Sequence, residues 1–210
     1  RVGQRLTGSP NQERANEWAR DTMSGWGLQN AHLETFPFGR GWETDGATVE
    51  MIAPDRAQLY VIPKAWTPGT NGVVKGEVVR LNATTKEDLD KMKGTLVGKI
   101  VLLGESRELK PETEAALKRY DDKALADIAG YNIPGARFQD PTGRVFTRED
   151  IMRRFAFQRE LQKFIADEKP ALVIEGSRGE AGLIFVGGSQ AYRKGEHEGI
   201  PWVYMAAEHF

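Results

Sequence analysis

Histidine is the first residue type to check for metal or acid–base chemistry, and this chain has His32, His197 and His209. A pair of catalytic zinc ions needs several converging imidazole and carboxylate ligands and a general base. None of these histidines stands in a His-x-Asp or His-Glu-x-x-His spacing. His197 lies between Glu196 and Glu198, but neighbouring residues on a turn rarely converge on one ion, so this string indicates a solvated loop. The sequence therefore predicts no catalytic and no metal-ligating residue.

Serine and carboxylate chemistry also lacks a complete motif. Residues 177–180 and 187–189 combine serine with glycine, but they have neither the Gly-x-Ser-x-Gly elbow nor a phosphate-loop signature, so they indicate tight turns between strands. Cysteine is absent, which excludes disulfides, thiolate zinc sites and a cysteine nucleophile. Acidic pairs stand at 121–122 and 149–150, and the second falls in the first turn of an expected helix, where the helix dipole accounts for negative charge.

Composition narrows the class of protein further. The chain has 210 residues, of which 40% are hydrophobic and 28% charged, which is typical of a folded globular protein. The formal net charge is -1, and basic and acidic residues are interleaved, so nucleic acid is not an expected partner. The longest apolar runs, 99–103 and 182–186, are far shorter than the roughly 20 residues that span a bilayer, so we expect no membrane insertion.

Capping residues and apolar patterns outline the elements that must carry these residues. Helices are expected at 10–24 after Ser9, at 86–93 after Thr85, and at 148–167 after Thr147, with Pro170 ending the last. An extended stretch is expected from Leu33. Strands are expected at 49–52, 59–62 and 76–81 as a small antiparallel sheet, and then at 98–103, 171–174, 182–186 and 202–205. Residues 111–146 look like a surface excursion, and 206–210 like the start of another helix, which would mean that the chain is cut inside an element.

Large aromatic residues in glycine- and proline-rich loops are the most informative feature of the surface. Trp42, Trp66, Phe36 and Phe38 lie where packing does not obviously demand them, so they are candidates for an interdomain or substrate-cleft contact. Ordinary local packing is the alternative, and for Trp42 and Trp66 the two interpretations are equally supported. Trp18 falls on the apolar stripe of the first helix, so we expect it to be packed in a local core.

Specific strings on these elements resemble a known family. Arg5-Leu6-Thr7-Gly8-Ser9-Pro10, followed by Ala19 and Trp26-Gly27-Leu28, is similar to the opening of family M28 zinc aminopeptidases. A second resemblance begins at Gly76-Glu77-Val78-Val79, continues through Gly98-Lys99-Ile100-Val101-Leu102 and ends at Ile200-Pro201-Trp202-Val203-Tyr204-Met205-Ala206-Ala207-Glu208. This stretch resembles a protease-associated (PA) domain, which many members insert between the leader and the catalytic core. The stretch 104–146 is longer than the usual link between PA strands.

The resemblance implies an α+β (mixed α/β) fold with a leader at 1–43 and a PA domain of the swivelling β/β/α type at 44–210, interrupted by a helical and loop excursion at about 104–168. It implies a secreted or periplasmic protein whose two zinc ions lie in a catalytic domain outside this chain. The partners would be that domain of the same polypeptide and peptide substrates, whose access the module shapes or restricts. The alternatives are a protein- or peptide-binding module that acts independently of catalysis, and a complete hydrolase, for which the sequence supplies no constellation.

Overall fold

The computed structural model describes residues 2–109, 113, 115, 117, 119–130, 147–197 and 199–210, and within them the chain is mixed α/β, as predicted. The helices are α1 (Pro10–Gly25), α2 (Lys86–Lys91), α3 (Asp122–Ala129), α4 (Arg148–Glu168) and the short 3-10 helix η1 (Gln190–Tyr192). The strands are β1 (Val49–Met51), β2 (Ala57–Leu59), β3 (Val61–Pro63), β4 (Val78–Leu81), β5 (Ile100–Leu103), β6 (Leu172–Gly176) and β7 (Trp202–Met205).

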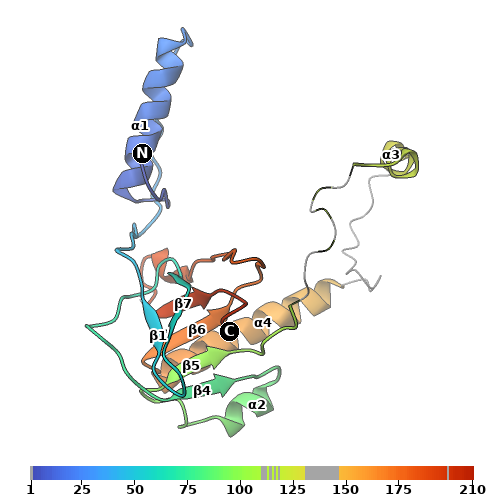
Figure 1. Ribbon diagram of the computed structural model, residues 1–210. Helices are drawn as coiled ribbons and strands as arrows, with labels where there is room; N and C mark the ends of the chain where they lie inside the picture. The colour runs from blue at the N-terminus through green and yellow to red at the C-terminus, as the bar shows by residue number, and fades with distance from the viewer. Residues whose placement is uncertain are drawn as a thin grey trace.

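A five-stranded sheet in the order β3-β7-β6-β5-β4 forms the centre of the fold (Figure 1). Strands β4, β5, β6 and β7 are parallel to one another, and β3 pairs with β7 in the antiparallel sense. The register places Val101 opposite both Val79 and Val173. Parallel strands need connections that cross over a face of the sheet, and α2 and α4 lie in two of these connections.

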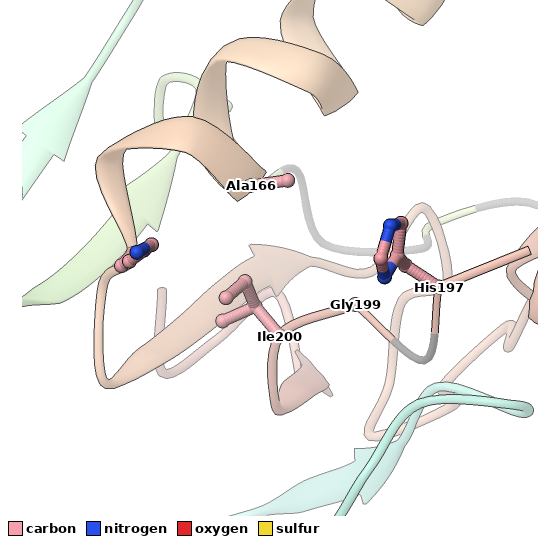
Figure 2. A pocket seen from close by; sticks show the side chains of 5 residues that line it. Ala166, His197, Gly199 and Ile200 are labelled. Carbon is pink, nitrogen blue, oxygen red and sulfur yellow. The ribbon is translucent and has the colours of Figure 1, made fainter.

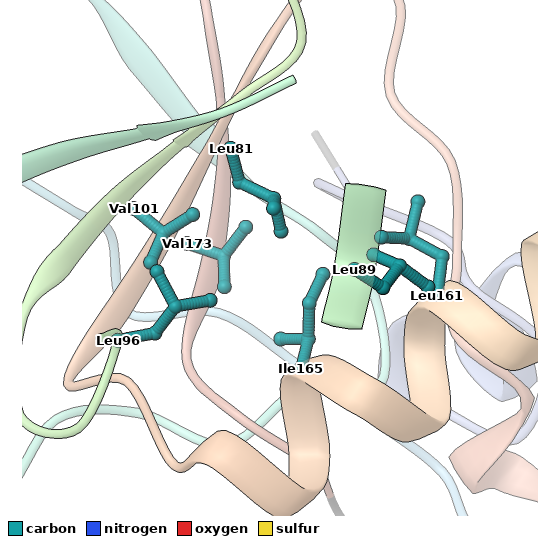
Figure 3. Packing of buried hydrophobic residues seen from close by; sticks show 7 residues of the cluster. All are labelled: Leu81, Leu89, Leu96, Val101, Leu161, Ile165 and Val173. Atoms are coloured by element: carbon teal, nitrogen blue, oxygen red, sulfur yellow. The ribbon is translucent and has the colours of Figure 1, made fainter. Parts of the chain in front are cut away.

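One face of the sheet packs against α2 and α4. Figure 3 shows Leu89 of α2 together with Leu161 and Ile165 of α4 facing the strand residues of this core. The strand and turn members of the cluster are Leu81, Leu96, Val101 and Val173. Since Leu81, Leu96, Val101 and Val173 are all fully buried, this layer is the main hydrophobic core.

The opposite face is covered by a hairpin and by the last residues of the chain. Strands β1 and β2 pair with each other, and Val49 and Leu59 pack against a second cluster. The buried members of that cluster are Val61, Leu172, Ile174, Val203 and Met205. Residues 206–210 form a hydrogen-bonded turn rather than the expected helix, and Phe210 packs on the same cluster. Both faces of the sheet are therefore covered.

Helix α1 stands apart from the sheet (Figure 1). It begins as predicted, because the Ser9 side chain accepts a hydrogen bond from the Gln12 N–H at 3.2 Å and Pro10 occupies the first helical turn. None of its residues is buried. An isolated helix of this length is marginal in water, so packing against other residues would be needed to stabilise it.

The excursion predicted after Gly104 lies partly outside the described residues. Its described part contains α3, which is capped by Asp121 and has no buried residue. The capping boxes predicted for α2 and α4 are present, with Thr85 and Asp88 at the first and Thr147 and Asp150 at the second. The acidic pair 149–150 thus lies in the first turn of α4, as expected.

Three strand predictions are wrong. Residues 61–63 and 78–81 do not join β1 in a small antiparallel sheet, because they lie at the two opposite edges of the large one. Residues 182–186 form no strand of either sheet, and the stretch from Leu33 pairs with none. Among the described residues, none of the helices combines the length and the apolarity that crossing a bilayer would take.

The core makes a direct prediction about stability. Leu81→Ala should lower the free energy of unfolding by about 3 kcal/mol, because it removes buried methyl groups and leaves a cavity between β4, α2 and α4. Val97→Ala is the matched control, because Val97 is 62% exposed and should change this free energy by less than about 0.5 kcal/mol. Urea unfolding of the unsubstituted protein and of the two variants measures these changes in free energy. Equal losses in the two variants would contradict the assignment of the core.

Candidate functional site

The histidines do not converge. His32 is exposed, and its ring nitrogens lie 2.8 Å from the Asn30 carbonyl and 3.2 Å from a Glu34 carboxylate oxygen, which raise its pKa. His209 Nδ1 accepts a hydrogen bond from the Tyr60 N–H at 2.8 Å. These two residues are therefore engaged in local contacts of different parts of the chain.

His197 lines an open pocket of about 450 Å³ with Ala166, Lys169, Gly199 and Ile200. In Figure 2 the His197 ring lies to one side of Ile200, with Ala166 near the end of α4 across from both. Glu198, the residue after it, lies outside the described residues. No group of three or more His, Cys, Asp or Glu side chains in the described ranges is placed to hold a metal ion.

Ser177 organises a loop. Its hydroxyl accepts hydrogen bonds from the N–H groups of Gly179 at 3.1 Å and Phe185 at 2.8 Å, and the residue is buried. A nucleophilic serine needs a base within hydrogen-bond reach, and these contacts are all to the backbone. The interpretation of 177–180 as a turn is consistent with this arrangement.

Two of the predicted aromatic residues meet in one cluster. Phe38, Trp66 and Tyr192, here called the aromatic triad, have Phe38 stacked on Tyr192 with ring centroids 4.9 Å apart and an angle of 8° between the rings. Trp66 is tilted against both, at 5.8 Å from Phe38 and 5.4 Å from Tyr192. Such pairs add to the stability gained from burial. The triad therefore attaches the segment after α1 to the sheet domain.

Backbone contacts lock the triad in place. Trp66 Nε1 donates to the Arg40 carbonyl at 3.0 Å, and the Arg40 N–H donates to the Tyr192 carbonyl at 2.9 Å. Glycine is required at two close approaches: a Cβ at Gly39 would lie 2.0 Å from the Tyr192 carbonyl oxygen, and a Cβ at Gly188 2.7 Å from the Trp66 ring. A larger residue at Gly39 would push that segment away from Tyr192, and one at Gly188 would push its loop away from Trp66.

The remaining aromatic candidates lie outside the triad. Trp42 is half-buried, and its Nε1 donates to the Thr67 carbonyl at 2.9 Å. Phe36 is exposed. Trp18, expected in a local core, is 65% exposed, and Trp26 is 75% exposed. The prediction for Trp18 is wrong because the apolar stripe of α1 faces no other described element.

A buried lysine is the feature that sequence reasoning missed. The Lys64 ammonium lies 3.6 Å from Glu175 Oε2 and 3.7 Å from the centroid of the Trp202 ring. Trp202 Nε1 donates to the same carboxylate oxygen at 3.1 Å. Burial lowers the pKa of Lys64, opposed by the charge of Glu175, and burial together with Glu175 raises the pKa of Tyr204 to about 12.

This buried cluster ties strands together. Lys64 follows β3, Glu175 belongs to β6, and Trp202 and Tyr204 belong to β7. The ammonium is enclosed by a carboxylate and an aromatic face, so it serves as a structural ion pair rather than as a nucleophile. The signal in the sequence is a single lysine in the otherwise apolar run 61–66.

Comparisons with known proteins give two structural likenesses. No family model matches the sequence, and no curated protein matches it. The solved structure of a peptidase M28 precursor from Shewanella amazonensis SB2B is similar over 98% of this chain and 38% of its own, with 19% identity and a TM-score of 0.49. An aminopeptidase from Aneurinibacillus sp. strain AM-1 is similar over 99% of this chain and 36% of its own, with 15% identity and a TM-score of 0.44. The chain thus spans less than two fifths of either.

The buried ion pair makes a prediction that separates it from a surface pair. Lys64→Met should lower the free energy of unfolding by about 3 kcal/mol, because Glu175 loses its charged partner in a partly desolvated place. Adding Glu175→Gln should recover part of that loss. Lys123→Met, which breaks the exposed Lys123–Asp127 pair, should change it by less than about 1 kcal/mol. A double-mutant cycle in urea measures the coupling, and a coupling near zero would contradict the structural role.

Proposed function

We propose that this chain is the non-catalytic front part of a secreted or periplasmic M28-type zinc aminopeptidase. Residues 1–43 are the leader, and residues 44–210 form a PA domain of the swivelling β/β/α type. The module shapes or restricts the access of peptides to a zinc site that lies outside this chain. Its partners are the catalytic domain of the same polypeptide, which would hold both zinc ions, and the peptide substrates of that domain.

The observation that carries this proposal is the state of helix α1. The helix is well capped, yet none of its residues is buried, and Trp18 and Met23 on its apolar stripe are exposed. Trp26, directly after the helix, is also exposed. Large apolar side chains exposed along one helix favour an interaction surface there. A catalytic domain packed on the leader would cover it, as the resemblance of residues 5–10 and 26–28 implies.

The chemistry of the described residues agrees with an accessory role. Ser177 is bonded to the backbone, Lys64 is bound in an ion pair, and His32 and His209 lie in separate contacts. A module of this kind alters selectivity through occlusion and differential binding, which is worth at most a few kcal/mol. Hydrolysis itself would come from water activated by the two zinc ions.

An alternative is a protein- or peptide-binding module that acts without the catalytic domain. Strand β4 is an edge of the five-stranded sheet, and Val78 on it is exposed, so a further strand could be added there. Binding of a peptide by the isolated chain, with no effect on any peptidase, would favour this alternative.

The first test of the proposal is zinc content and turnover of the 210-residue chain. After dialysis the protein should contain much less than one zinc per chain, measured by plasma mass spectrometry. It should release no chromophore from aminoacyl p-nitroanilides when zinc is added, because the metal ligands and the general base lie elsewhere. Stoichiometric zinc together with turnover would overturn the proposal.

The second test uses the exposed face of α1. Trp18→Ala should change the free energy of unfolding of this chain by less than about 0.5 kcal/mol, because the side chain is mostly in water. In a polypeptide that includes the catalytic domain, the same substitution should cost about 2 kcal/mol or more, because an aromatic contact is lost. Glu17→Ala, on the neighbouring position of the helix, is the control and should be neutral in both. Equal small effects of Trp18→Ala in both proteins would argue against the leader contact.

A further inference from the structure

The stretch 182–186 lies in no helix or strand; it begins at Gly182, which belongs to a turn and has a φ of 74°, and residues 183–186 continue with hydrogen bonds along one edge. We call it the open segment; its sequence is Gly-Leu-Ile-Phe-Val. In an extended chain the N–H and C=O of one residue point to the same side, and the next residue points to the other. The hydrogen bonds of Leu183, Phe185 and Gly187 follow this alternation, whereas the Gly182 N–H donates to the Glu208 carboxylate.

The odd-numbered residues are bonded to the rest of the domain. The Leu183 N–H donates to the Glu180 carbonyl at 3.0 Å, and the Phe185 N–H donates to Ser177 Oγ at 2.8 Å. The Gly187 carbonyl accepts from the Ala65 N–H at 3.1 Å. By contrast, the backbone N–H and C=O groups of Ile184 and Val186 have no hydrogen-bond partner among the described residues. These two residues therefore present an unpaired ladder along one edge.

The open segment is held rigidly. The Ser177 hydroxyl that anchors Phe185 is itself buried, and Arg107 binds Glu180 at 2.9 Å and also the Gly179 carbonyl. At the other end, Glu208 Oε1 accepts from the Gly182 N–H at 3.0 Å. A preordered edge loses little conformational entropy when a partner strand adds to it.

The side chains of the open segment are apolar and largely in water. Leu183 is 63% exposed, Phe185 61% and Val186 53%, and the segment carries no charge. Proteins usually protect exposed edges with charged residues. Strand β4, the edge named above for the alternative function, carries such charges, since Arg80 lies on it and Glu77 precedes it in a pair with Lys99, so it is the less favourable of the two edges. The open segment has no charged side chain of its own, although the Glu208 carboxylate binds the N–H of its first residue, Gly182.

The length of the open segment decides what kind of partner fits. A five-residue strand is about 17 Å long. Stable dimers need about 20 to 30 residues on each side, so a second copy paired through this edge alone would not form a stable interface. A short peptide needs only a few backbone bonds and neighbouring side-chain contacts.

We propose that the open segment binds an extended oligopeptide substrate by strand addition, with the backbone of Ile184 and Val186 pairing with the peptide. Leu183 and Phe185 lie on one face of the added strand and Val186 on the other, so apolar peptide side chains are favoured. This proposal rests on the proposed function, because it assigns to one segment the contact with peptides on their way to the zinc site.

Fluorescence anisotropy of the 210-residue chain tests the assignment. The probe is a fluorescein-labelled hexapeptide, Lys-Thr-Val-Tyr-Val-Thr, which favours an extended strand. Val186→Pro removes one unpaired N–H without breaking a hydrogen bond between described residues, and it should weaken binding at least about tenfold. The same peptide with N-methyl groups at alternate residues should lose binding by a similar factor, because its backbone donors are removed.

Val97→Pro is the matched control. Val97 is as exposed as the apolar residues of the open segment and occupies the first central position of the turn closed by the Lys99 N–H and the Leu96 carbonyl, where proline is favoured. It should leave peptide binding unchanged. Thermal unfolding of both proline variants checks that each remains folded.

Three results would overturn the assignment. They are no anisotropy change with the probe, binding that N-methylation or Val186→Pro leaves unchanged, and self-association of the chain that Val186→Pro abolishes, which would identify a second copy as the partner. Each leaves the zinc and turnover result untouched, so failure of this inference is distinguishable from failure of the proposed function.

Discussion

The pairing of β4, β5, β6 and β7 as parallel strands is the constraint on which the rest of the structure depends. Parallel sheets are stable when both faces are covered. Here α2 and α4 cover one face, and the β1–β2 hairpin together with Phe210 covers the other. The central strands are accordingly apolar almost throughout, as Ile100–Leu103 shows. Elements that do not cover the sheet, above all α1, are left without a core of their own.

The strand order of the described sheet also bears on where a ligand could bind. In open α/β sheets, ligands bind beyond the carboxyl ends of the strands where the order of strands reverses. The parallel strands here follow one another in sequence, from β4 to β7, without such a reversal. The polar side chains beyond these ends bond to one another, as Asn82 does to Glu105 at 2.5 Å and Arg107 to Glu180. These described polar groups at the edge therefore make structural contacts with one another.

Local signals in the sequence were sufficient to place the helices. They could not predict which strands pair when the two strands lie far apart in the chain. Ser9, Thr85 and Thr147 cap the predicted helices because a cap depends on residues three positions away. The partner of β3, by contrast, is β7 near the other end of the chain, and no local pattern specifies it.

The candidate site was predictable to a smaller extent. Aromatic residues in loops identified Phe38 and Trp66, but Tyr192 joins them only through the fold. An apolar stripe says that a helix needs a partner and not where that partner lies, which is why Trp18 was misplaced in a local core. The apolar run 182–186 has the composition of a strand, yet the hydroxyl of Ser177 takes the place of a neighbouring strand on one edge. When a side chain replaces a backbone group as hydrogen-bond partner of a strand, no periodic pattern in the sequence indicates it.

The two incomplete surfaces of the chain differ in what can complete them. The backbone groups within helix α1 bond to one another, so only its side chains can contact a partner. The exposed side chains of Trp18 and Met23 are therefore best covered by a surface that is already folded. The open segment offers unpaired backbone groups beside apolar side chains, and an extended chain that has not yet paired its own backbone complements it. The catalytic domain and the peptide substrate proposed above are partners of these two kinds. The aromatic triad lies between the two parts, because Phe38 belongs to the segment after α1 and Trp66 lies against Gly188, which follows the open segment.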